Sequence, residues 1–168
     1  MLPVSVHYKN KMASKILAEK LKEILIENDK VLILCVGTSK YMCDCLGPSL
    51  GTLLKDIRIP LNIFGTLQDP IHFLNAKDKI KEISRKLPDY KVICIDACLG
   101  DSVGYIHIKN GSIIPGLGIG KTHDPMGDFS MEVVIEDQRK SKKIMKLPIT
   151  LEYIMNMAFV IRDSFMYA

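Results

Sequence analysis

The sequence predicts an α/β fold, a three-layer α/β/α sandwich with a mostly parallel sheet, in a single domain that spans residues 1–168. Short apolar runs, typical of strands that are buried on both faces, alternate along the chain with amphipathic helical patterns. The chain has 168 residues, of which 48% are hydrophobic and 25% charged. That length supplies one hydrophobic core and is short for two domains.

The first half of the chain alternates helix and strand. An amphipathic helix is expected over residues 11–27, and a buried strand over 31–36. Similar apolar runs at 92–95 and, more weakly, at 61–64 predict two further strands. Because the runs at 31–36 and 92–96 are apolar on both faces, we expect them to be neighbouring central parallel strands. Helices are expected between the strands, at 45–56 and 76–87. The apolar face of the first helix would hold Met12, Ile16, Leu17, Leu21, Ile24 and Leu25.

The second half of the chain adds strands and a last helix. Residues 105–109 predict a strand that ends in a tight turn at Asn110-Gly111, and residues 131–135 predict another. A final apolar helix is expected over 148–165, with Pro148 near its first turn. The basic run 139–143 before it is expected to be a solvated loop. Methionines that suit either a core or a subunit interface leave a homo-oligomer open: Met145, Met155, Met157 and Met166.

The charge and the apolar pattern argue against two classes of partner. A formal net charge of +4 is too mild to indicate a nucleic-acid-binding protein. No stretch approaches the roughly 20 apolar residues of a membrane span, and the N-terminus lacks a signal-peptide core. We therefore expect a cytoplasmic protein without a membrane partner. Its five cysteines are then expected to be free thiols.

The segment IPGLGIGKTHDPMGD, residues 114–128, ends its glycine run in Gly-Lys-Thr but does not form a nucleotide-binding loop. Such a loop needs a glycine where this chain has Pro115, which has no amide to donate. Pro125 and Gly127 would also break the helix that should follow. No nucleotide cofactor is therefore expected. Glycine is used where the backbone passes close to another group, so we expect this segment to line a site with Gly116, Gly118, Gly120 and Lys121.

Acidic and polar residues follow the predicted strands at one edge of the sheet. Gly37 and Asp44 come after the first of the buried strands, Gly65 and Thr66 after the second, and Asp96 at the end of the third. Sites in open α/β sheets lie at the carboxyl ends of the strands, so we expect these residues to converge there. A plain helix cap is the alternative for Asp44, whereas a carboxyl at a buried strand end needs a partner.

Several segments resemble the YyaC family of sporulation proteins: VGTSKYMCDCLGPSLG, IFGTLQDPIHFLN, VICIDACLGDSVGYI, PGLGIGK and MGDFSM. They occur in order and cover residues 31–135. The blocks around Asp44 and Asp96 also resemble the germination protease that degrades small spore proteins. More distantly they resemble the hydrogenase-maturation endopeptidases, which share the phosphorylase/hydrogenase-like α/β fold.

The resemblance implies a cytoplasmic endopeptidase of sporulation that hydrolyses a protein or peptide substrate. Asp44 and Asp96 match the catalytic acids of the germination protease. In the maturation enzymes the matching acids help to hold a metal with a histidine as a further ligand, which here implies one divalent metal ion bound by Asp44, Asp96 and His123. A solvated loop histidine is the alternative for His123. Substrate binding would fall to residues at the same edge and in the glycine segment: Gly37, Gly65, Thr66, Gly116, Gly118, Gly120 and Lys121.

Two hypotheses follow. In the first, Asp44 and Asp96 activate a water molecule, either directly or through the metal, with their carboxylate oxygens within about 6 Å of each other in a cleft. In the second, the protein is a non-catalytic binding or assembly protein of the sporulating cell that retains the peptidase fold.

Overall fold

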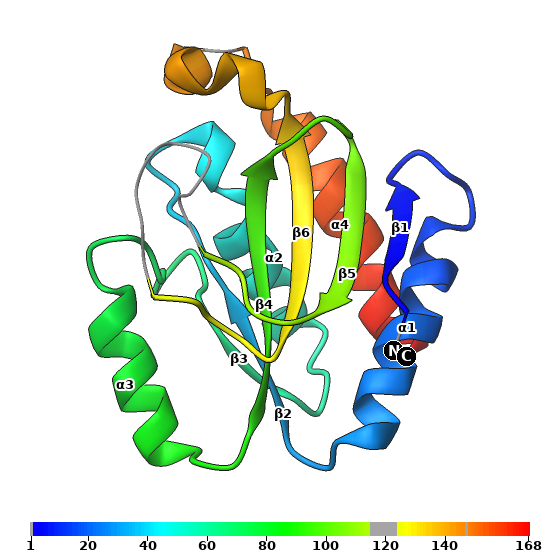
Figure 1. The fold of residues 1–168 in the computed structure, drawn as a ribbon, viewed down its shortest axis with the longest axis vertical. Coiled ribbons are helices and arrows are strands. Elements are labelled where there is room, and N and C mark those ends of the chain that lie inside the picture. The colour runs from blue at the N-terminus through cyan, green and yellow to red at the C-terminus, as the bar shows by residue number, and fades with distance from the viewer. Residues whose placement is uncertain (1, 115–123, 147) are drawn as a thin grey trace.

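A six-stranded mixed sheet forms the centre of the described part of the chain (Figure 1). The computed structural model describes residues 2–114, 124–146 and 148–168. The strand order is β1-β5-β6-β4-β2-β3. Neighbours among β3, β2, β4 and β6 run parallel, whereas β5 pairs antiparallel with both β6 and β1. The strands are β1 (Val4–His7), β2 (Val31–Cys35), β3 (Asn62–Phe64), β4 (Lys91–Leu99), β5 (Tyr105–Asn110) and β6 (Phe129–Glu136).

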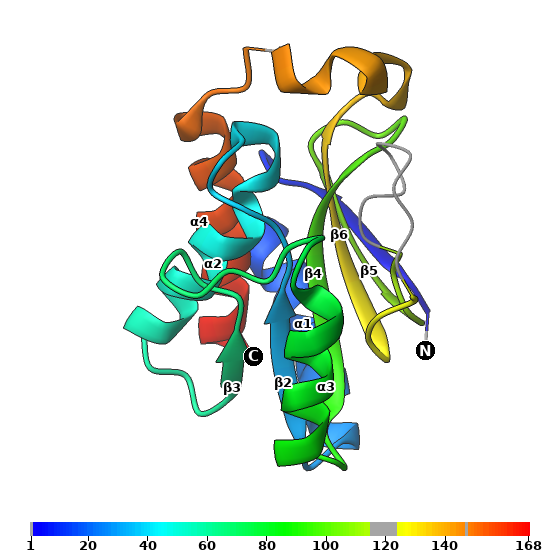
Figure 2. The same cartoon turned by 90° about the vertical axis from the view of Figure 1, so that its left-hand side faces the viewer.

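Helices pack on the two faces of this sheet unequally. Helices α1, α2 and α4 share one core with the first face, and α4 lies beside both α1 and α2 (Figure 2). Helix α3 packs on the second face, over β2 and β4. The helices are α1 (Ala13–Glu27), α2 (Leu46–Asp56), α3 (Ala76–Lys86) and α4 (Leu151–Tyr167), with 3-10 helices η1 (Met42–Asp44) and η3 (Gln138–Lys146).

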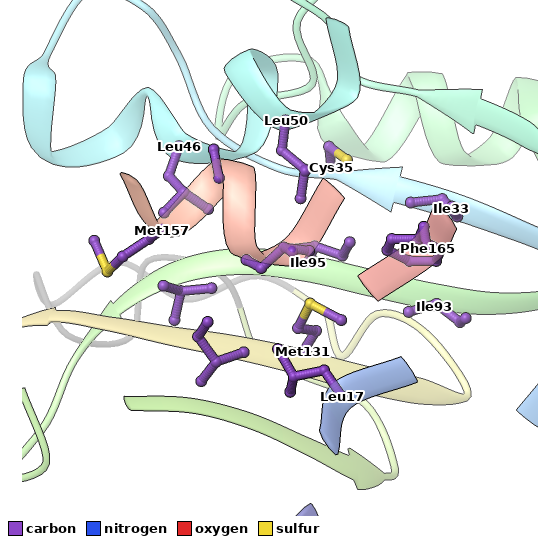
Figure 3. Close-up of a cluster of buried hydrophobic side chains, with 14 of the residues drawn as sticks. Leu17, Ile33, Cys35, Leu46, Leu50, Ile93, Ile95, Met131, Met157 and Phe165 are labelled. Atoms are coloured by element: carbon purple, nitrogen blue, oxygen red, sulfur yellow. The ribbon is translucent and has the colours of Figure 1, made fainter. Parts of the chain in front are cut away.

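Two hydrophobic cores result from the alternation of side chains along the strands. The first contains Leu17 of α1, Leu50 of α2 and Met157 of α4 against Ile33 and Ile95 of the sheet (Figure 3). The second, smaller core lies under α3 and is built from Leu32, Leu34, Val36, Ile71, Ala76, Ile83, Cys94, Ile113 and Met126.

The predicted α/β class is confirmed, and so are the two central strands. β2 pairs in parallel with β4 from Val31–Lys91 to Cys35–Ile95, and the buried hydrophobic side chains of both strands belong to the two cores. The three-layer sandwich and the phosphorylase/hydrogenase-like assignment stay predictions, since the described residues place α3 alone among the α-helices on the second face. In the same residues, no helix combines the length and apolarity needed to cross a membrane.

Several element predictions were wrong in detail. The strand β1 was not predicted; Val6 lies opposite Ile106 of β5 and is buried there. The basic run 139–143 lies within the 3-10 helix η3 rather than in an irregular loop. The last helix begins after Thr150, whose hydroxyl accepts a hydrogen bond from the Tyr153 amide, so Pro148 precedes the helix.

The buried face of α1 is rotated from the predicted one. Met12 and Ile16 are 49% and 38% exposed, whereas Ala13 and Ala18 are buried because α1 packs against both α4 and β1. Lys20 is also buried on this helix, with its ammonium 2.9 Å from the Glu23 carboxylate. Its aliphatic stem can therefore cover apolar surface while its charge is paired.

Candidate functional site

Asp96 lies inside β4 and not at its end. The strand continues to Leu99 because β6 keeps pairing with it beyond the point where β2 stops at Cys35. Side chains alternate along a strand, so Asp96 lies on the same face as Cys94 and Cys98, away from the core that contains Ile95. The Asp96 side chain is buried, with the residue 8% exposed.

The surroundings of Asp96 favour its protonated form. Burial raises the pKa of this carboxyl well above its usual 3.8, and the negative charge of Asp44 and then that of Glu132 raise it further. A hydrogen bond from the Ala97 backbone N–H offsets part of the increase. The charge of Asp44 thus contributes to the raised pKa of Asp96, whereas the predicted separation of the two carboxylates within about 6 Å stays a prediction.

Asp44 is the last residue of η1, in the connection between β2 and α2. Its backbone N–H donates to the Tyr41 carbonyl at 3.0 Å, and its carbonyl accepts from the Thr38 N–H at 2.9 Å. The N-cap of α2 is Cys45, with no side-chain hydrogen bond to the helix. Asp44 is therefore the residue before the N-cap of α2 and not the N-cap itself.

Gly37 sets the position of Asp44. A Cβ atom at Gly37 would lie 2.2 Å from the Asp44 carbonyl oxygen, and Gly37 has a φ of +140°. Its N–H donates to the Ile71 carbonyl at 2.8 Å, which ties the end of β2 to the segment after β3. Only glycine lets the chain turn this close to its own backbone.

Further glycines fit α2 against the ends of β2 and β3. A Cβ at Gly47 would lie 2.0 Å from the Val36 carbonyl oxygen, and one at Gly51 would lie 2.1 Å from that of Gly65. A Cβ at Gly65 would in turn lie 1.8 Å from the Cys35 carbonyl oxygen. These contacts account for Gly65, as for Gly37, by backbone packing. Their predicted role in substrate binding stays a prediction.

Thr66 is buried and closes a turn after β3. Its hydroxyl accepts a hydrogen bond from the Asp69 N–H at 3.1 Å, and its own N–H donates to the Asp69 carbonyl at 3.1 Å. Thr66 thus shapes the loop beside the end of β2, and its predicted contact with substrate stays open.

A polar row crosses the sheet next to Asp96. Asp96 of β4 lies opposite Glu132 of β6, and Glu132 lies opposite His107 of β5. The Glu132 carboxylate is 2.8 Å from the Lys109 ammonium, and the Ser102 hydroxyl is 2.9 Å from Nε2 of His107. Burial lowers the pKa of His107, and Lys109 acts in the same direction while Glu132 opposes it. The sequence interpretation missed Glu132 and His107.

The cysteines near the site are protonated thiols. Burial, followed by the charges of Glu132 and Asp96, raises the pKa of Cys98 to about 12. Burial also raises the pKa values of Cys43 and Cys45, to which the charge of Asp44 adds. All five cysteines lie in the described part of the chain as thiols outside any disulfide, as the sequence predicted. A thiolate nucleophile has no support here, since nucleophilic cysteines have lowered pKa values.

The predicted metal site is only partly within the described chain. Across residues 2–114, 124–146 and 148–168, no group of three or more His, Cys, Asp or Glu side chains is placed to hold a metal ion. His123 lies outside the described residues, as do Gly116, Gly118, Gly120 and Lys121. The metal ligands and the substrate role of the glycine segment therefore stay predictions.

Comparisons with known proteins assign the chain to a family. Residues 5–164, which include both Asp44 and Asp96, match a family described as "Protein of unknown function (DUF1256)". The chain is also 34% identical over 137 residues to a protein of Bacillus subtilis (strain 168) named "Uncharacterized protein YyaC". That match covers 80% of this chain and 67% of the YyaC protein.

Proposed function

This chain belongs to the DUF1256 family and is YyaC-like, and from that premise we propose that it hydrolyses peptide bonds with Asp44 and Asp96 as an acid–base pair. The observation that carries the proposal is the buried carboxyl of Asp96, whose pKa is raised well above 3.8 by burial and then by the charge of Asp44. Two neighbouring carboxyls whose environments separate their pKa values can divide the acid and base roles between them.

The proposed step is the addition of water to a peptide carbonyl. Asp44, as the charged carboxylate, takes a proton from the water molecule while the water oxygen forms a bond to the carbonyl carbon. Asp96, as the protonated acid, gives its proton to the leaving nitrogen as the C–N bond breaks. The products are a carboxylic acid and an amine. Exchange with solvent then returns Asp44 to its charged form and Asp96 to its protonated form.

The resemblance to germination protease and to the maturation endopeptidases supplies the substrate class and the setting. The substrate would be a protein or peptide, cleaved in the cytoplasm of a sporulating cell. No nucleotide, nucleic acid or membrane has a part in this proposal, and association of the chain into a homo-oligomer is compatible with it.

A divalent metal ion is a second form of the same proposal. If Asp44, Asp96 and His123 held such an ion, it would activate the water and polarise the carbonyl. The described residues do not by themselves assemble a ligand set of three.

One observation favours the alternative, a non-catalytic binding or assembly protein. Gly37 and Gly65 are explained by close backbone packing and need no substrate contact. A protein that uses this fold only to bind a partner would retain these backbone contacts without hydrolysing anything.

The test uses a library of peptides from a digested proteome, with cleavage products identified by mass spectrometry. Wild type should cleave a defined subset, and Asp44→Asn and Asp96→Asn should each lower the rate by about a hundredfold or more. Asp101→Asn is the matched control, because Asp101 is an exposed acid in the loop after β4 whose carboxylate accepts a hydrogen bond from Gln138. No cleavage by wild type, or unchanged cleavage by either site variant, would refute the proposal. If both site variants restored sporulation to a strain that lacks the protein, that result would then favour the binding-protein alternative.

A further inference from the structure

A cavity of about 580 Å³ lies between α3 and the second face of the sheet, away from Asp44 and Asp96. Its floor consists of Leu32 and Leu34 of β2 and Val92 of β4, and its first wall includes Ile80 and Ile83 of α3. Val92 is four residues before Asp96 on β4, about 13 Å along the strand at 3.3 Å per residue. The volume falls within the range of about 300–1,000 Å³ that is usual for small-molecule sites.

The second wall is held in place by backbone pairing. Residues 124–128 form it, and Met126 exchanges two hydrogen bonds with Ile113, at 2.8 and 2.9 Å. Gly127 lies against the strand, because a Cβ there would be 2.9 Å from Cβ of Cys94. Asp128 accepts hydrogen bonds from the Lys91 ammonium and the Val92 N–H, both at 2.9 Å. The cavity is thus lined by secondary structure and paired backbone on each side.

Two lysines at the rim give the cavity a charge preference. Lys77 and Lys81 line it from adjacent turns of α3, and in the described part of the chain neither ammonium lies within 4.0 Å of a carboxylate. The other two lysines of α3 are paired, Lys79 with Asp69 and Lys86 with Glu82. Like charges four residues apart on a helix repel each other. An anion between Lys77 and Lys81 would remove that repulsion.

The acids on the opposite wall set the orientation of a ligand. Asp128 is already paired with Lys91, whereas Asp124 is exposed at the far rim. An anionic group would be repelled by Asp124 and attracted by Lys77 and Lys81. The rim is therefore anion-accepting on the side of α3, while the floor is apolar.

We propose that this cavity binds a small amphipathic carboxylate, with its hydrocarbon chain against the partly buried Ile80, Leu87 and Val92 and its carboxylate at Lys77 and Lys81. The inference does not rest on peptide hydrolysis, because the cavity contains neither Asp44 nor Asp96. Apolar contact supplies the affinity, and the two rim lysines, Lys77 and Lys81, select for a negative charge on the ligand.

The experiment titrates the full chain with sodium octanoate, below its micelle concentration, and with uncharged octanamide. Calorimetry measures the affinities, and amide NMR shifts locate the ligand. Octanoate should bind once per chain with shifts confined to 32–34, 77–92 and 124–128, and octanamide should bind at least about tenfold more weakly. The double variant Lys77→Ala/Lys81→Ala should lose about tenfold or more of the octanoate affinity and none of the octanamide affinity.

Arg85→Ala is the matched control. Arg85 is an exposed cation of α3 that does not line the cavity, so its removal should leave both affinities unchanged. Absence of saturable octanoate binding, equal affinity for the two ligands, or an unchanged double variant would each overturn the proposal. Shifts centred on other residues would do so as well.

Discussion

Gly65→Ala tests whether close backbone packing holds the site together. At Gly65 the backbone φ is +84°, and an added Cβ would lie 1.8 Å from the Cys35 carbonyl oxygen, where real Cβ contacts do not fall below 3.0 Å. A non-glycine residue in this left-handed region costs about 1–3 kcal/mol, and forced overpacking costs about 1–3 kcal/mol more. Urea unfolding should therefore show a loss of about 2–6 kcal/mol in the free energy of unfolding.

Gly111→Ala separates the two causes. Gly111 also has a positive φ, +103°, but a Cβ there would meet nothing within 4 Å. This control should lose only the conformational cost, about 1–3 kcal/mol. If Gly65→Ala were no less stable than Gly111→Ala, the packing argument for Gly65 would fail, and the substrate-binding interpretation of this glycine would gain weight.

Three further predictions concern the buried acid, a thiol and a helix end. Asp96→Asn should raise the free energy of unfolding at pH 7, because the folded protein raises the pKa of the Asp96 carboxyl. This gain in stability should shrink as the pH falls toward 3.8, and a gain that persists at that pH would contradict the raised pKa as its cause. Cys98 should resist alkylation by iodoacetamide at pH 7.5 in the folded protein, since its pKa is about 12, and rapid modification seen by mass spectrometry would argue against this. Thr150→Ala should cost about 1 kcal/mol in urea unfolding, whereas Thr150→Ser should cost little, because Ser keeps the hydroxyl that accepts from Tyr153; equal losses would exclude capping as the cause.

The central strands were predictable because their pattern is local. β2 and β4 are apolar toward both faces, and burial on both faces follows directly from that composition. β1 has no such signal: Val4–His7 is short, and it becomes a strand because Val6 packs in the core beside Ile106. Its structure thus depends on pairing with a strand about a hundred residues away.

The site was predictable in part. Asp44 and Asp96 were identified from the strand ends and from the family resemblance, and the charge of Asp44 adds to the effect of burial in raising the pKa of Asp96. Glu132 was missed because its place beside Asp96 depends on the register of β4 and β6, which local sequence does not specify. The structural role of Gly37 was equally unpredictable, because the sequence does not distinguish a glycine that contacts the Asp44 backbone from one that contacts a ligand.

An NMR titration of the Asp96 carboxyl carbon in wild type and in Asp44→Asn tests whether the two carboxyls form an acid–base pair. In the wild type, Asp96 should titrate well above the usual 3.8. Removing the charge of Asp44 should lower the Asp96 pKa while leaving it above that value, because burial remains the larger cause. An Asp96 carboxyl that titrates near 3.8, or one whose pKa is the same in both proteins, would contradict the acid–base pair.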